Sequence, residues 1–303
     1  MKNKLFFVTI FISLLGLIAC ENQVKITVIQ DIPYSSYSVN NKTGKLLLDL
    51  YLPHLNSSQA LPVLIYIPGG GWLSGNKESC PGEVVAKRGY ILACINYRSS
   101  TQAIFPAQIH DVKNAVRWLR SHADKYNLDP NRIGAWGESA GGHLSALLGT
   151  SAGIKALEGN SQAPSISSKI QAVCDWYGPT DFTQVPPAFE EPITPAVLEK
   201  YKNAPWAIYT EATHRLLGGP VSKNLKLASL ANPINYIDSN DPPFLILHGE
   251  LDNIVPLSQS ELLEKALQKK GVEVTFIRAP NLKHSYAGKN GERYDSKLIN
   301  RAI

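Results

Sequence analysis

Short runs of hydrophobic residues alternate along most of this chain with stretches whose apolar positions have helical spacing. A continuous apolar run is typical of a strand that is covered on both faces of a sheet. Such runs predict core strands at residues 61–67, 89–97, 133–136, 170–176, 243–248 and 272–277. The helical spacing predicts helices over residues 106–126, 144–148 and 256–270. Strands that alternate with helices predict an α/β protein with a mainly parallel, doubly covered sheet.

Two regions depart from this rhythm. Residues 24–30 and 45–52 are predicted as antiparallel edge strands, because the second alternates in part and turn-forming Asn and Gly residues lie between them. Residues 180–241 are proline-rich, unevenly apolar and too long for a plain loop between two core strands. We expect a lid-like insertion over about residues 182–240 that packs over the site. A peripheral insertion unrelated to substrate is the alternative.

The stretch Gly137-Glu-Ser-Ala-Gly141 lies between a predicted strand and a predicted helix. A serine flanked by glycines in that setting is typical of a nucleophile elbow, a turn too tight for side chains at the glycine positions. The helix that follows would direct its N-terminus at the reacting atoms and favour negative charge there. The pattern itself is loose, but chance does not readily supply the strand before it and the helix after it. Ser139 is therefore the candidate nucleophile.

An elbow serine needs a base, and the base needs an orienting acid. On folds with this elbow the order is serine, acid, histidine, and of the seven histidines only His284 follows the last predicted strand. The loop before that strand offers two acids, Glu250 and Asp252. We favour Asp252, whose short side chain suits a fixed bond to imidazole, although it could instead cap the next helix. His248 precedes both acids, so a structural or surface role is expected for it.

A tetrahedral intermediate also needs amide donors for its oxyanion. The glycines of Pro68-Gly-Gly-Gly-Trp72 directly follow a core strand and let backbone amides approach a substrate. Gly70 and Gly71, together with Ala140 after the nucleophile, are the expected donors. A phosphate-binding loop is the rival interpretation, but the G-K-[ST] ending is missing. No C-x-x-C motif or histidine cluster indicates a metal, and no cofactor is implied.

Charge and composition narrow the class of protein. The 303 residues are 44% hydrophobic and 18% charged, as in an ordinary globular chain. A net charge of +5, in part from lysines at the N-terminus, is too small and too scattered to argue for a nucleic-acid partner. Cys94 and Cys174 lie in apolar runs and are predicted to be buried free thiols. A disulfide among Cys80, Cys94 and Cys174 would also suit an exported protein, and spacing does not decide the matter.

The N-terminus has the pattern of a secretory signal. Lys2 and Lys4 precede an apolar segment that is too short to span a membrane. Its end, Leu17-Ile-Ala-Cys20, resembles the bacterial lipobox, in which cleavage precedes a cysteine that is then lipidated. We therefore expect a lipoprotein signal peptide at 1–19, a mature chain over 20–303 lipidated on Cys20, and membrane attachment at the bacterial cell envelope. A plain signal peptide is the alternative.

Together these motifs resemble the α/β-hydrolase superfamily on its hormone-sensitive-lipase-like side. The most similar group is the bacterial esterases named for bifunctional xylan deacetylase/feruloyl esterases. The resemblance is carried by Ile67-Pro-Gly-Gly-Gly-Trp-Leu-Ser-Gly75, Asn96-Tyr-Arg98, Gly137-Glu-Ser-Ala-Gly-Gly-His143, Trp176-Tyr-Gly-Pro-Thr-Asp181 and His248-Gly-Glu-Leu-Asp252. It implies one α/β-hydrolase domain with Ser139, Asp252 and His284 as a catalytic triad. Arg98 and Asp111 also match family positions, and we interpret both as structural.

The resemblance has two departures. The family usually has a histidine before the three glycines, where this chain has Pro68, and that histidine braces the oxyanion loop. The tail after His284 is short and polar, so a small or displaced closing helix is expected.

The sequence thus predicts a serine hydrolase that cleaves carboxylic esters through an acyl-enzyme on Ser139. Its substrates would be acetyl or feruloyl esters of plant polysaccharide, or a small soluble ester. The sequence does not choose among these, because fold and triad do not determine the pocket. An amidase or peptidase would use the same triad. A non-catalytic binding protein on this fold is disfavoured, since such proteins typically lose a triad member and none is missing here.

Overall fold

The computed structural model describes residues 24–284, except residues 40, 56–58, 161–162, 185–195, 197–198 and 200–203. The predicted signal peptide, Cys20 and the tail after His284 therefore lie outside the described residues. None of the described helices has the length and hydropathy to cross a membrane.

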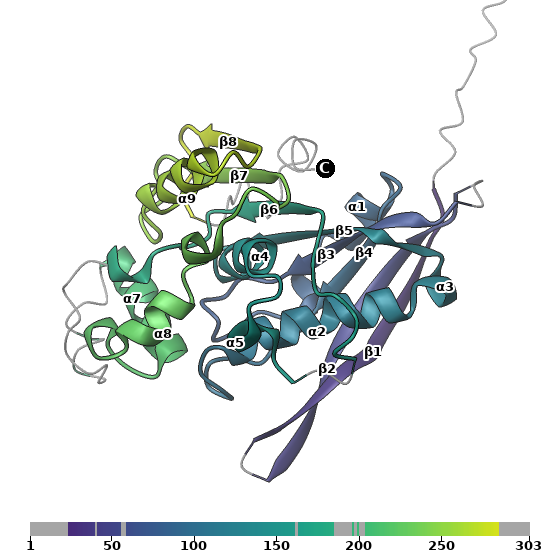
Figure 1. Ribbon diagram of the computed structural model, residues 1–303, viewed down its shortest axis with the longest axis horizontal. Coiled ribbons are helices and arrows are strands. Elements are labelled where there is room, and N and C mark those ends of the chain that lie inside the picture. The colour runs from purple at the N-terminus through teal and green to yellow at the C-terminus, as the bar shows by residue number, and fades with distance from the viewer. Residues whose placement is uncertain are drawn as a thin grey trace, which may run out of the picture.

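An eight-stranded sheet forms the centre of the molecule, in the order β1-β2-β4-β3-β5-β6-β7-β8 (Figure 1). Its strands are β1 (Ile26–Val39), β2 (Lys42–Pro53), β3 (Leu61–Ile67), β4 (Ile91–Ile95), β5 (Leu128–Glu138), β6 (Ala172–Trp176), β7 (Phe244–Gly249) and β8 (Val274–Ala279). β2 pairs antiparallel with β1 and with β4, and all other pairs are parallel. The predicted fold, a mainly parallel sheet with an antiparallel edge, is confirmed.

Helices connect the parallel strands and cover the sheet. They are α1 (Gly82–Ala86), α2 (Ala107–Ser121), α3 (Ala123–Tyr126), α4 (Ala140–Thr150), α5 (Lys155–Glu158), α7 (Pro205–Leu217), α8 (Leu225–Leu230) and α9 (Ser258–Lys269), with short 3-10 turns η1 (Lys77–Ser79), η2 (Phe182–Gln184), η4 (Val221–Lys223) and η5 (Pro233–Tyr236). The helix predicted over 106–126 is interrupted at His122, whose ring stacks on Trp118 and contacts the Trp118 carbonyl. The insertion at 182–240 contributes α7 and α8 (Figure 1).

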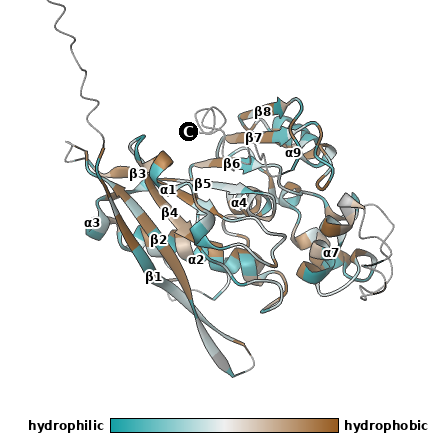
Figure 2. Cartoon of the chain, turned by 180° about the vertical axis from the view of Figure 1, so that it is seen from behind, coloured by the Kyte–Doolittle hydropathy of each residue, from teal (hydrophilic) through white to brown (hydrophobic). Residues whose placement is uncertain are grey.

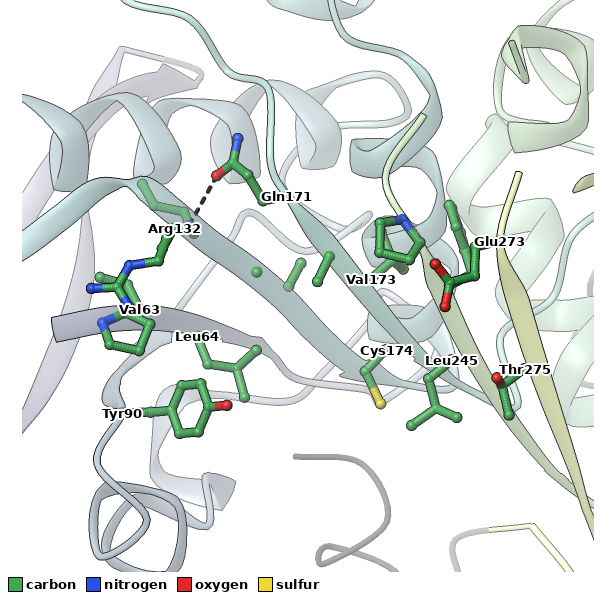
Figure 3. A pocket seen from close by; sticks show the side chains of 17 residues that line it. Val63, Leu64, Tyr90, Arg132, Gln171, Val173, Cys174, Leu245, Glu273 and Thr275 are labelled. Carbon is green, nitrogen blue, oxygen red and sulfur yellow. Dashed lines mark hydrogen bonds between the residues drawn. The ribbon is translucent and has the colours of Figure 1, made fainter. Parts of the chain in front are cut away.

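Two hydrophobic cores lie on the two faces of the sheet. Side chains alternate between faces along a strand, so Ile65 and Ile67 of β3 pack in the larger core with α2, α4 and α9, whereas Tyr66 packs in the smaller one with α1. Hydrophobic residues accordingly follow the strands of the sheet (Figure 2). Part of the second face forms a groove of about 390 Å³ between the starts of several strands, where Leu64, Cys174 and Leu245 line it (Figure 3).

The prediction for Cys94 was wrong. Cys94 of β4 forms a disulfide with Cys80, just before α1, with their Cα atoms 6.0 Å apart. The short segment η1–α1 packs back over β4, and this tertiary contact brings two cysteines together that the sequence separates by 14 positions. Cys174 is free and buried, as predicted.

Candidate active site

Ser139 lies between the end of β5 and the start of α4, in backbone angles that few residues other than glycine adopt (φ 53°, ψ −120°). The flanking glycines make this turn sterically possible. A Cβ on Gly137 would lie 2.2 Å from the Gly141 carbonyl oxygen, and one on Gly141 would lie 2.0 Å from the Ile67 carbonyl oxygen. The Ser139 amide donates to the Trp176 carbonyl at 2.8 Å, which ties the elbow to the neighbouring strand. The structure therefore has the strained elbow that the glycine spacing predicts.

The three predicted triad residues come together at the carboxyl edge of the sheet. His284 Nε2 lies 3.0 Å from Ser139 Oγ, and His284 Nδ1 lies 2.7 Å from Asp252 Oδ2. A carboxylate only accepts, so Nδ1 carries the ring proton and Nε2 is free to accept the hydroxyl proton of the serine. This is the geometry of a nucleophile, a base and an orienting acid.

Asp252 is held from both of its oxygens. Oδ1 accepts hydrogen bonds from the amides of Ile254 and Val255 at 2.9 Å each, while Oδ2 faces His284. Burial of the side chain acts to raise the pKa of the Asp252 carboxyl, but hydrogen bonds from His248 and His284 outweigh it, so this pKa lies well below its usual value. Asp252 is thus an ionised acceptor at neutral pH. Glu250, the other sequence candidate, is exposed on the same loop, and the structure brings Asp252 to the base instead.

The glycine loop lies beside the elbow because β3, which it follows, is the hydrogen-bonded neighbour of β5. Gly70 and Gly71 both have positive φ (100° and 61°), and a Cβ on Gly69 would lie 2.8 Å from the Glu138 carbonyl oxygen. The amides of Gly70, Gly71 and Ala140 have no acceptor within the described part of the chain. Ala140 is the first residue of α4, where amides point away from the helix. These three are available as oxyanion donors.

The loop is braced without the family's histidine. The Tyr97 hydroxyl donates to the Pro68 carbonyl at 2.9 Å, and Pro68 is buried. Burial, with a smaller contribution from the Glu138 carboxylate, raises the pKa of the Tyr97 hydroxyl, which keeps it protonated and able to donate. The backbone oxygen of residue 68 is therefore fixed by a side chain from the loop after β4.

Glu138, which lies between Gly137 and Ser139 in the elbow, makes contacts that the sequence did not reveal. Its carboxylate accepts from the Tyr66 hydroxyl at 3.0 Å and from the Tyr177 hydroxyl at 2.8 Å, and only 7% of the residue is exposed. Tyr66 comes from β3 and Tyr177 follows β6, so the pair ties the elbow to both neighbouring strands. A charged residue that ends an apolar strand was the signal available, but its partners are far away in sequence.

The two remaining sequence interpretations concern Arg98 and His248. Arg98 and Asp111 form an ion pair with nitrogen and oxygen 2.6 Å apart, which anchors the start of α2 and supports a structural role. His248 is completely buried and lies against Asp252, with Nε2 3.2 Å from Oδ2. It is therefore part of the surroundings of the candidate acid, which its place in the chain did not predict.

A pocket of about 380 Å³ opens above Ser139 and His284. One wall comes from α7, through Ile208, Tyr209 and Ala212. A Cβ on Gly71 would lie 3.0 Å from the Ala212 Cβ, so α7 packs directly against the glycine loop. The inserted segment therefore shapes the space in which a substrate would lie. Within the described ranges, no group of His, Cys, Asp or Glu side chains is arranged to hold a metal ion.

Comparison with known proteins places this geometry in a family. The model of the BD-FAE family matches residues 48–267. Esterase LipQ of Mycobacterium tuberculosis is 33% identical over 261 residues, which is 84% of this chain and 56% of that protein. This chain thus spans little more than half the length of the curated relatives it matches.

Solved structures agree with this placement. A truncated carbohydrate esterase from gut microbiota is 31% identical, with a TM-score of 0.73 over 93% of this chain and 95% of that one. An acetyl ester-xyloside bifunctional hydrolase from Caldicellulosiruptor lactoaceticus is 26% identical, with a TM-score of 0.69 over 89% and 94%. The resemblance drawn from the motifs is confirmed, and this chain belongs to the BD-FAE family and has the α/β-hydrolase fold.

Proposed function

We propose that this protein is a carboxylic ester hydrolase that works through an acyl-enzyme on Ser139. One observation carries the proposal: the His284 ring bridges Ser139 Oγ at 3.0 Å and Asp252 Oδ2 at 2.7 Å. Esterases among the relatives support the reaction class.

The proposed reaction has two halves. His284 Nε2 takes the proton from Ser139 Oγ as that oxygen attacks the ester carbonyl, and the oxyanion forms against the amides of Gly70, Gly71 and Ala140. The same imidazolium then gives its proton to the departing alcohol. Water then gives a proton to His284 Nε2 as it attacks the acyl-enzyme, and the imidazolium returns that proton to Ser139 Oγ as the acyl–oxygen bond breaks and the acid is released. Each half therefore uses one base and one set of amide donors.

Electrostatics favour this cycle. Asp252 is ionised at neutral pH because its pKa is lowered, so it stabilises the imidazolium that forms in each half. The amides of the glycine loop and of the start of α4 are oriented before the reaction, and need no rearrangement when negative charge develops. The start of α4 adds the favourable end of a helix dipole.

We propose esters carried on polysaccharide, with acetyl or feruloyl acids, as the substrate class. The names of two solved relatives, a carbohydrate esterase and an acetyl ester-xyloside hydrolase, support this choice. A small soluble ester is the alternative. Hydrolysis of small esters (p-nitrophenyl acyl esters and methyl hydroxycinnamates) is compared at equal enzyme concentration with hydrolysis of acetylated xylan and of feruloylated xylan. Release of acetate or ferulate from the polysaccharide is expected, and activity on small esters alone would contradict the polysaccharide assignment.

The reaction class is tested by covalent labelling. A fluorophosphonate probe should label the wild type on Ser139, and Ser139→Ala should abolish labelling and nearly all esterase activity while the thermal unfolding curve is retained. Ser121→Ala is the matched control, because Ser121 is an exposed hydroxyl on α2 whose hydrogen-bond partners among the described residues are the Trp118 carbonyl and the neighbouring His122 ring. Labelling that persists in Ser139→Ala would refute the nucleophile. Faster cleavage of p-nitroanilides than of esters would make the protein an amidase.

We also propose export and lipid attachment at Cys20, supported by the lysines, the apolar run and the Ala19-Cys20 ending of the N-terminal sequence. The full chain should then partition into detergent with membranes. Cys20→Ser should abolish incorporation of radiolabelled fatty acid. A wild-type protein that is soluble and cleaved at another position would exclude the anchor.

A further inference from the structure

A second imidazole, outside the proposed triad, contacts the carboxylate that orients the base. His248 lies near the end of β7 and is completely buried. Its Nε2 lies 3.2 Å from Asp252 Oδ2, the same oxygen that His284 Nδ1 contacts at 2.7 Å. One carboxylate oxygen is therefore shared by two rings.

The hydrogen-bond partners of His248 define its tautomer. Nε2 also lies 3.0 Å from the Val255 carbonyl, which can only accept, so the proton resides on Nε2 and is shared between that carbonyl and Asp252. Nδ1 lies 2.7 Å from the buried Ser260 hydroxyl of α9, which can donate to its lone pair. The neutral ring with its proton on Nε2 therefore has partners at both nitrogens.

This arrangement gives the Asp252 carboxylate four donors. Two backbone amides bind Oδ1, and two imidazole N–H groups approach Oδ2. Each donor removes a direction in which the carboxylate could rotate, and a carboxylate that cannot rotate holds the His284 ring aimed at Ser139. His248 itself does not line the substrate pocket.

We propose that His248 is a positioning residue for the reaction: its Nε2–H fixes Asp252 Oδ2 so that the carboxylate presents its second lone pair to His284 Nδ1. The inference rests on the proposed function and deepens it. His248 exchanges no proton with substrate. It acts through Asp252 alone. The ring of Tyr177 packs beside both imidazoles, with its centroid 4.7 Å from that of His284 and 6.4 Å from that of His248.

The test compares two substitutions that differ in the donor. His248→Phe keeps a planar ring and removes the N–H, whereas His248→Gln places an amide N–H near the position of Nε2. We expect kcat for a p-nitrophenyl ester to fall roughly ten- to a hundredfold in His248→Phe, with KM little changed, and to recover most of that loss in His248→Gln. Thermal unfolding and fluorophosphonate labelling of both variants show that the measured protein is folded and has its nucleophile.

The pH profile separates positioning from packing. Without the His248 donor, the Asp252 carboxylate should stabilise the protonated form of the base more strongly. The acid limb of kcat/KM should therefore move to higher pH in His248→Phe and return towards wild type in His248→Gln. Two carboxyls act on His248: Asp252, and Asp175 of β6, whose pKa burial raises to about 6. Because Asp175 is present in every variant, an Asp175→Asn background shows whether it contributes to the limb.

The outcomes are distinct. Wild-type kcat and pH profile in folded His248→Phe, or equal losses in the Phe and Gln variants, would overturn the inference while the esterase proposal stands. A wild type that neither labels nor cleaves esters would instead refute the proposed function. If the variants fail to fold, ¹⁵N spectra of histidine-labelled wild type decide: a neutral His248 with its proton on Nε2 is expected, and a proton on Nδ1 alone would rule out donation to Asp252.

Discussion

The elbow after β5 and the loop after β7 lie at the same edge of the sheet, yet they hold their functional side chains by different means. The elbow is determined by steric exclusion: glycines at 137 and 141 leave no room for a Cβ, and Ser139 takes a strained backbone conformation. The loop is determined by hydrogen bonds, with Asp252 held by two amides and two imidazoles. Steric exclusion positions the nucleophile by restricting the backbone around it, whereas hydrogen bonds orient the Asp252 carboxylate.

This contrast predicts that substitutions in the elbow and in the loop impair the protein in different ways. A side chain added in the elbow must move backbone, so it should damage folding and activity together. A donor or acceptor removed from the loop leaves the backbone in place, so activity should fall much more than stability. The following substitutions test this difference, from the largest expected effect to the smallest.

Gly141→Ala should have the largest effect, because the new Cβ would lie 2.0 Å from the Ile67 carbonyl oxygen. We expect the free energy of unfolding to fall by about 3 kcal/mol or more, with loss of fluorophosphonate labelling. Gly271→Ala is the control for backbone strain without a clash: Gly271 has positive φ (74°) and open space around it, whereas Gly141 is not a positive-φ glycine. The control should therefore lose only about 1–2 kcal/mol. Chemical denaturation of both variants measures the difference. Equal losses would show that a Cβ at Gly141 costs no more than ordinary backbone strain, and would contradict steric exclusion as the determinant of the elbow.

Asp252→Asn should come next, with an effect on rate rather than on folding. The amide keeps the shape but favours the wrong tautomer of His284, a change that costs roughly 10⁴ in kcat in serine proteases. Glu250→Gln, two residues away and exposed, should lose less than about tenfold, a limit of about 1.4 kcal/mol in the barrier. Values of kcat at about pH 7 to 8, where a histidine base is largely neutral, distinguish the two carboxyls. The opposite ranking would transfer the orienting role to Glu250.

Tyr97→Phe should have the smallest effect, since it removes one neutral hydrogen bond to the Pro68 carbonyl. We expect kcat to fall by less than about tenfold, in line with a bond worth roughly 1 kcal/mol. Pro68→His, which restores the residue usual in the family, should keep or raise kcat, because the carbonyl of residue 68 remains available to Tyr97. Steady-state kinetics of the single and double variants measures this. A large loss in Pro68→His would mean that the glycine loop depends on proline.

Much of the fold could be predicted because its signals are local. The buried strands were visible as apolar runs, and the elbow was visible as glycines between a strand and a helix. Strand ends were predicted less accurately. β5 begins at Leu128, well before the apolar run at Ile133. Most of the first residues of this strand are partly exposed and pair little with β3, so they carry no apolar signal. The break between α2 and α3 lies at His122, where the side chain contacts Trp118, and hydrophobic spacing does not record such a contact.

By itself the sequence determined the sheet, the position of the elbow, the chain order of serine, acid and histidine, and the family. These depend on periodicity, turn chemistry and neighbouring residues. Only the tertiary structure decided which of Glu250 and Asp252 meets His284, that Cys80 joins Cys94, that Tyr97 braces the glycine loop, and that His248 contacts Asp252. Each of these contacts is made by a side chain, either with another side chain or with a backbone carbonyl. Such contacts depend on how strands and helices pack, because a shift of one residue in register or a rotation of one helix would change the partners without changing the local pattern.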